Sequence, residues 1–188
     1  MDLISRFGAG SIADLPDDLR DEINAIAERT GFVPNVFLAL ANRPDELRPF
    51  LDLHTALMER DSGLTKAERE MIVVATSSAN NCMYCVVAHG AILRVRTKDP
   101  HLADRVAVNY RRAEISPRQR AMLDFAVKVA TESHALEETD FDTLRTHGFS
   151  DDDIWDIGAV TAFYGYSNRM ADLMALTPNE EFYSMGRG

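Results

Sequence analysis

Residues 64–90 read LTKAEREMIVVATSSANNCMYCVVAHG, and this stretch decides the fold. Thr65 opens a T-x-x-E capping-box pattern, which predicts a helix over 65–79. The residues after Glu70 are apolar on every face, so this helix is expected to be buried. Two asparagines then interrupt the pattern, and a second helix is predicted over 82–96. The stretch therefore predicts two consecutive helices joined by a tight turn.

Helical spacing continues along the rest of the chain, without a convincing alternating pattern of a β-strand. A proline inside a helix removes a hydrogen bond, so Pro49 is expected to kink or restart the helix in which it lies. The fold class is predicted to be all-α. Further helices are predicted over 17–29, 36–41, 44–59, 100–110, 117–133, 138–147 and 151–176.

The length of 188 residues indicates one domain over 1–188. We divide it into an N-terminal helical extension over 1–40, a core over 41–176 and a C-terminal tail over 177–188. The tail is polar at its start and glycine-containing at its end, and it is expected to dock on a neighbouring subunit or to stay loose.

Composition and charge narrow the class of partners. The formal net charge is -10, which argues against nucleic acid and anionic membranes, because a phosphate backbone requires a basic surface. No apolar run approaches the roughly 20 residues of a membrane span. The first residues do not show a basic segment followed by an apolar one, so no signal peptide is expected. A cytoplasmic protein is therefore predicted.

The chain has only two cysteines, and they fall three residues apart. Cys82, Cys85 and His89 share one face of the second helix, because their spacings are three, four and seven residues. Cys82 lies at the helix start, where the positive end of the dipole favours a thiolate. A buried carboxylate at Glu70 needs a partner or has a raised pKa. The turn could bring these four residues into one proton-transfer cluster.

In this spacing, Glu70, Cys82, Cys85 and His89 resemble the signature of alkylhydroperoxidase D, which belongs to the carboxymuconolactone decarboxylase-like superfamily. The flanking text is similar to the peroxidase-related branch, with TGFVPNVFLALANRP before the motif and SNRMADLMALTPNEEF near the C-terminus. The resemblance covers most of the chain. The four-residue pattern is more specific than a bare C-x-x-C pair.

The resemblance implies an all-helical, alkylhydroperoxidase D-like oligomer, trimer-based or dimeric, that acts as a peroxidase without metal, haem or other cofactor. It implies that Cys85 attacks a hydroperoxide substrate to give a sulfenic acid, which Cys82 resolves as a disulfide. Glu70 and His89 would relay the proton, and a dithiol reductant, of the lipoyl type in the best-known members, would regenerate the thiols. Tyr84 stands where alkylhydroperoxidase D has a histidine, and it could line the site or simply pack.

Other interpretations of these residues stay open. The cysteines could be two small buried hydrophobes, or two ligands of a zinc ion, with His89 and with either Glu70 or water, in a non-catalytic metal-binding protein. Glu70 could be a surface carboxylate paired with Arg69 or Lys66, and His89 a core histidine. A general thiol–disulfide oxidoreductase or a redox sensor would use the same two thiols. The decarboxylase activity of the wider superfamily is disfavoured, because lactone chemistry does not need adjacent thiols.

Aromatic and polar residues elsewhere in the chain are interpreted structurally. His54 is expected in the core or at an interface, and Trp155 in the core. The last long helix carries a group whose helical spacing indicates core or subunit interface rather than substrate pocket, namely Tyr164, Tyr166, Asn168 and Arg169.

Overall fold

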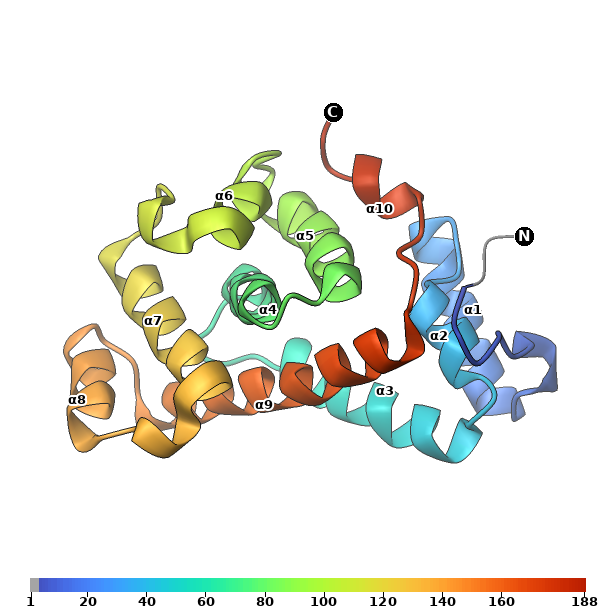
Figure 1. Ribbon diagram of the computed structural model, residues 1–188, viewed down its shortest axis with the longest axis horizontal. Coiled ribbons are helices and arrows are strands. Elements are labelled where there is room, and N and C mark those ends of the chain that lie inside the picture. The colour runs from blue at the N-terminus through green and yellow to red at the C-terminus, as the bar shows by residue number, and fades with distance from the viewer. Residues whose placement is uncertain (1–3) are drawn as a thin grey trace.

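Helix α4, Lys66–Ala79, runs through the middle of the molecule, and Figure 1 shows it nearly end-on with other helices around it. The computed structural model describes residues 4–188, so the first three residues of the predicted N-terminal extension lie outside it. No strand occurs within residues 4–188, and the all-α prediction is confirmed. The other helices are α1 Asp17–Thr30, α2 Asn35–Leu40, α3 Pro44–Met58, α5 Met83–Thr97, α6 Leu102–Asn109, α7 Pro117–Glu132, α8 Glu138–Thr146, α9 Asp151–Met174 and α10 Glu181–Ser184, with short 3-10 turns at Ile12–Asp14, Tyr110–Arg112 and Ser133–Ala135.

The burial of α4 follows from its position. It packs against α5, α6, α7 and α9, and every residue over 68–77 is buried. The capping box predicted at its start is present, because the Thr65 side chain accepts from the backbone N–H of Glu68 and the Glu68 side chain accepts in return. The uniformly apolar pattern after Glu70 thus correctly indicated a central helix.

A buried ion pair joins α4 to α9. The guanidinium of Arg69 lies 2.7 Å from the carboxylate of Asp156, and both side chains are almost inaccessible to solvent. Arg60 pairs with the second oxygen of the same carboxylate at 3.1 Å. Charges this deeply buried require partners, so these contacts fix the two helices relative to one another.

Pro49 does not interrupt α3, in contrast to the predicted restart. The helix continues from Pro44 to Met58 because Leu47 and Leu51 are buried on either side of the proline, while Pro49 itself is exposed. The burial of two leucines outweighs the single hydrogen bond that the proline removes.

The C-terminal tail packs on its own chain, so the expectation of a loose tail was wrong. Asn179 accepts from the backbone N–H of Asn35 and donates to the carbonyl of Val33. The buried side chain of Arg94 donates to the carbonyls of Phe182 and Met185. Short-range patterns missed α10 because these contacts link residues far apart in the sequence.

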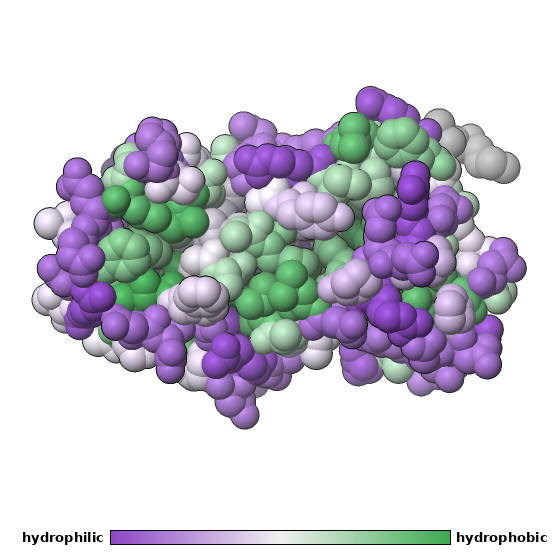
Figure 2. All heavy atoms as spheres, turned by 90° about the horizontal axis from the view of Figure 1, so that it is seen from below, coloured by the Kyte–Doolittle hydropathy of each residue, from purple (hydrophilic) through white to green (hydrophobic). Residues whose placement is uncertain are grey.

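The face formed by α3 and α9 carries an apolar patch, visible near its middle in Figure 2. Trp155 lies on α9 and is 75% exposed, so the prediction of a core tryptophan was wrong. Asp156 and Ile154 on either side of it point inward, which turns Trp155 outward. In the part of the chain that the structure covers, no helix is both long and apolar enough to cross a membrane.

Candidate active site

The turn between α4 and α5 places the second helix beside the first. Asn81 has a φ of 58°, in the left-handed region that asparagine tolerates better than most residues. The backbone N–H of Cys82 donates to the carbonyl of Ser77 at 2.9 Å, which closes the turn. Cys82 is the N-cap residue of α5, and Cys85 and His89 follow on the next two turns. The two asparagines therefore form the predicted tight turn.

Glu70 and His89 form a buried pair across the two helices. His89 Nδ1 lies 2.8 Å from Glu70 Oε2, and Arg96 Nε lies 3.6 Å from the other carboxylate oxygen. Burial alone would lower the pKa of His89, but the charge and hydrogen bond of Glu70 raise it overall. The alternative of a surface carboxylate paired with Arg69 or Lys66 is wrong, since Glu70 is 2% exposed and those residues pair elsewhere.

The two thiols are free and differ in acidity. A hydrogen bond from Cys82 lowers the pKa of Cys85 to about 7 against the cost of burial, and the charge of His89 lowers it further, with Asn168 and Ser167 adding hydrogen bonds. The hydrogen bond to Cys85, together with burial, raises the pKa of Cys82 well above its usual range. The helix-start argument favoured Cys82, whereas these surroundings favour ionisation of Cys85, and two adjacent thiols do not both ionise.

A pocket of about 610 Å³ opens onto this cluster. Cys85, His89, Glu70 and Tyr84 line it, whereas Cys82 is not among the lining residues. The remaining wall is mostly apolar and comes from both ends of the chain, with Ile26, Val36, Phe37, Phe50, Phe182 and Met185 among its residues. A small molecule in this pocket would therefore meet Cys85 first.

Tyr84 both lines the pocket and holds its wall. Its hydroxyl accepts a hydrogen bond from the backbone N–H of Val36 at 3.1 Å. Burial raises the pKa of Tyr84, so the phenol stays protonated. Tyr84 thus lines the pocket and also packs within the chain, where it joins α5 to the start of α2.

Several pocket residues escaped the sequence-based prediction. His54 lies on the pocket wall against Phe163, at a centroid distance of 6.3 Å, and burial lowers its pKa to about 4, with the charge of His89 acting in the same direction. Tyr164 also lines the pocket, with its ring edge-on to His89 at 4.7 Å. Helical spacing of aromatics could not distinguish a pocket wall from ordinary core, because both are buried and apolar.

Two polar residues of α9 complete the surroundings of the thiols. Ser167 Oγ lies 3.9 Å from Cys85 Sγ. The side chain of Asn168 donates to Ser77 Oγ and accepts from Asn80, both at 2.9 Å. The predicted role of Asn168 at a subunit interface is therefore replaced by one inside the chain, where it braces the turn before Cys82.

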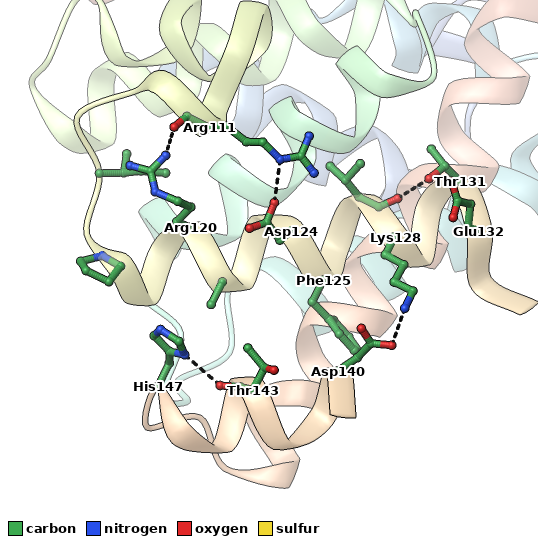
Figure 3. A pocket seen from close by; sticks show the side chains of 14 residues that line it. Arg111, Arg120, Asp124, Phe125, Lys128, Thr131, Glu132, Asp140, Thr143 and His147 are labelled. Atoms are coloured by element: carbon green, nitrogen blue, oxygen red, sulfur yellow. Dashed lines mark hydrogen bonds and ion pairs between the residues drawn. The ribbon is translucent and has the colours of Figure 1, made fainter. Parts of the chain in front are cut away.

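A second hollow of about 880 Å³ lies between α7 and α8, away from the thiols (Figure 3). Two ion pairs lie along it: Lys128 pairs with Asp140 at 2.6 Å and Arg111 with Asp124 at 3.1 Å. None of the predicted site residues lines it. Over residues 4–188, no three histidine, cysteine, aspartate or glutamate side chains are grouped as metal ligands.

The pattern of the carboxymuconolactone decarboxylase family matches residues 44–106, which include the thiols and the Glu70–His89 pair. A crystal structure of an alkylhydroperoxidase AhpD core, an uncharacterised peroxidase-related protein from Ralstonia eutropha JMP134, is 61% identical with a TM-score of 0.98 and covers 100% of this chain and 99% of that chain. The chain belongs to the alkylhydroperoxidase D-like branch of the carboxymuconolactone decarboxylase-like superfamily.

Two further solved structures extend the comparison. An uncharacterised peroxidase-related protein from Silicibacter sp. TM1040 is 45% identical, with a TM-score of 0.89 over 94% of this chain and 93% of that chain. The debrominase Bmp8 in its apo form is 23% identical, with a TM-score of 0.78 over 98% of this chain and 96% of that chain, and so shares the fold. No curated protein matches the sequence.

Proposed function

We propose that the protein is a thiol-dependent peroxidase that reduces hydroperoxides through a Cys82/Cys85 dithiol–disulfide cycle. The observation that carries this proposal is the asymmetry of the pair: Cys85 has a pKa lowered to about 7 and lines the pocket, whereas Cys82 stays protonated behind it. A thiolate facing a cavity that admits small molecules is the arrangement that attack on a peroxide requires.

The first step is attack of the Cys85 thiolate on one oxygen of the O–O bond. A sulfur–oxygen bond forms, the O–O bond breaks, and the other oxygen leaves as alkoxide, which takes up a proton to give the alcohol. Cys85 becomes a sulfenic acid. Cys82 then attacks the sulfur of that sulfenic acid, which gives the Cys82–Cys85 disulfide and releases water.

Glu70 and His89 are proposed as the proton relay. A carboxylate can only accept, so the proton in their 2.8 Å contact belongs to Nδ1 of His89. The second ring nitrogen is then available to accept the thiol proton and to return it to the leaving oxygen. The raised pKa of His89 favours a charged imidazolium beside the thiolate.

A general thiol–disulfide oxidoreductase or redox sensor is the second candidate. The burial of both cysteines argues against a protein as the exchange partner. Cys82 and Cys85 are 0% and 2% exposed, so a protein disulfide would have to displace the wall of the pocket before it reached either sulfur. A slender dithiol, such as a lipoyl arm, fits a cavity of this size and is the proposed reductant. We also propose that the protein is a homo-oligomer and that it acts in a reducing compartment such as the cytoplasm.

Titration of free thiols in the reduced, chelator-treated protein tests the proposal, before and after a small excess of cumene hydroperoxide. We expect both thiols to disappear together as one peroxide is consumed per chain. Survival of both thiols would contradict the peroxidase. Loss of thiols with a disulfide reagent but not with peroxide would favour the thiol–disulfide oxidoreductase.

A further inference from the structure

The hydroxyl of Tyr164 is a buried polar group without a partner. Within residues 4–188, its oxygen is inaccessible to solvent and makes no hydrogen bond. The ring is fixed edge-on against His89 at 4.7 Å and against Phe163 at 5.1 Å. A buried hydroxyl without a partner destabilises a fold by roughly 1–3 kcal/mol, so a group held in this way calls for an explanation.

The ring of Tyr164 lies against His89, one residue of the reaction cluster. The residue lines the same pocket as Cys85, Glu70 and His89. Burial raises the pKa of Tyr164 well above its usual value, and the negative charges of Glu70 and Cys85 raise it further. The phenol therefore keeps its proton at neutral pH and acts there as a neutral donor.

Three other polar groups of the pocket are already engaged. Glu70 accepts from His89, Ser167 contacts Cys85, and the Tyr84 hydroxyl accepts from Val36. The Tyr164 hydroxyl thus has an unused donor beside the groups that move the proton. We infer that Tyr164 donates a hydrogen bond to the oxygen that leaves when Cys85 cleaves the O–O bond, an inference that rests on the proposed peroxidase function.

The chemistry of the leaving oxygen explains why such a donor would matter. As the bond between Cys85 sulfur and one peroxide oxygen forms, the electron pair of the O–O bond moves to the other oxygen. That oxygen becomes an alkoxide, whose charge a hydrogen bond from the phenol stabilises. The proton that completes the alcohol comes from the imidazolium of His89, and Tyr164 keeps its own.

The test compares Tyr164→Phe with wild type on two peroxides. Cumene hydroperoxide releases an alkoxide, which needs the donor, whereas peracetic acid releases a carboxylate, which is stable without it. We expect the second-order rate of Cys85 oxidation to fall roughly tenfold to hundredfold with cumene hydroperoxide and less than about threefold with peracetic acid. Tyr166→Phe, on the same helix with an exposed ring, is the matched control and should leave both rates unchanged.

Tyr164→Phe removes one unpartnered oxygen, so this variant should unfold at the same temperature as wild type or at a higher one. An equal loss of rate with both peroxides, or no loss with cumene hydroperoxide, would overturn the inference while leaving the peroxidase intact. A wild-type protein that consumed neither peroxide would overturn the proposed function itself, and the inference with it.

Discussion

His89 and Glu70 meet at 2.8 Å although 19 positions separate them in the sequence, because the turn at Asn81 returns α5 along α4. Their contact sets the charge of the imidazole, and that charge in turn helps to lower the pKa of Cys85. The carboxylate therefore acts on the sulfur through the ring between them. Three groups on two helices form one electrostatic unit.

Replacement of Glu70 by Gln should remove the charge that acts on His89 and, through His89, on Cys85. Without the carboxylate, the pKa of His89 falls, less imidazolium is present at neutral pH, and the pKa of Cys85 rises above about 7. Peroxide consumption should drop roughly 100-fold at pH 7 and recover partly at higher pH, where the thiolate forms without help. The absorbance of the thiolate at different pH values measures the shift. Glu132→Gln, at an exposed position, is the control, and an unchanged titration in Glu70→Gln would contradict the relay.

The two thiols should respond differently to replacement by serine. Cys85→Ser should abolish peroxide consumption, because the attacking sulfur is gone. Cys82→Ser should consume one peroxide per chain and then stall as a sulfenic acid, which dimedone would trap and mass spectrometry would detect. Equal peroxide consumption by Cys85→Ser and wild type would remove the peroxidatic assignment.

The partly buried His54 should make the fold sensitive to acid. Its pKa is lowered to about 4 in the folded state and is near 6.5 when unfolded, so below pH 6.5 the unfolded chain binds a proton that the folded chain does not. Stability should therefore decline between about pH 6.5 and pH 4, by on the order of 2–3 kcal/mol from this residue. His89 has a raised pKa, so its contribution to stability has the opposite sign. It is present at low pH and is lost as the pH rises.

Denaturant unfolding of His54→Gln across this range isolates the contribution of His54. The variant should show a flatter decline than wild type, whereas the same replacement at the exposed His134 should leave the decline unchanged. Parallel curves for wild type and His54→Gln would refute a buried neutral imidazole at this position.

Removal of one partner of the buried ion pair between α4 and α9 should destabilise the fold strongly. Asp156→Ala leaves the guanidinium of Arg69 buried without its partner, at a cost of about 3–5 kcal/mol in the free energy of unfolding. The exposed Asp152→Ala on the same helix should cost less than about 1 kcal/mol. The double variant Arg69→Met, Asp156→Leu should regain much of the loss, and a double variant no more stable than Asp156→Ala would disagree with this account.

Local sequence patterns predicted the helices well because the signals are local. The capping box at Thr65, the asparagine turn and the apolar run after Glu70 each depend on residues a few positions apart. The same holds for the helical face that carries Cys85 and His89. Each of these features could be inferred from spacing alone.

The pocket could not be predicted in the same way, because its wall is assembled from distant segments. Tyr164 and His54 have the spacing of ordinary core residues, and only the packing of α3 and α9 beside α5 brings them to the thiols. The acidity of the two cysteines also depends on this packing. Helix geometry favoured ionisation of Cys82, whereas the hydrogen bond from Cys82 and the charge of His89 favour ionisation of Cys85.

The pocket wall draws on both ends of the chain, through Ile26 and Phe37 near the start and Phe182 and Met185 near the finish. These positions lie outside residues 44–106, the segment that contains the thiols and the Glu70–His89 pair. Part of the wall that selects the bound molecule is thus encoded in lengths of polypeptide separate from the thiols. A chimera that exchanged the two ends between relatives would alter which molecules fit, while the reactive sulfur kept its own acidity.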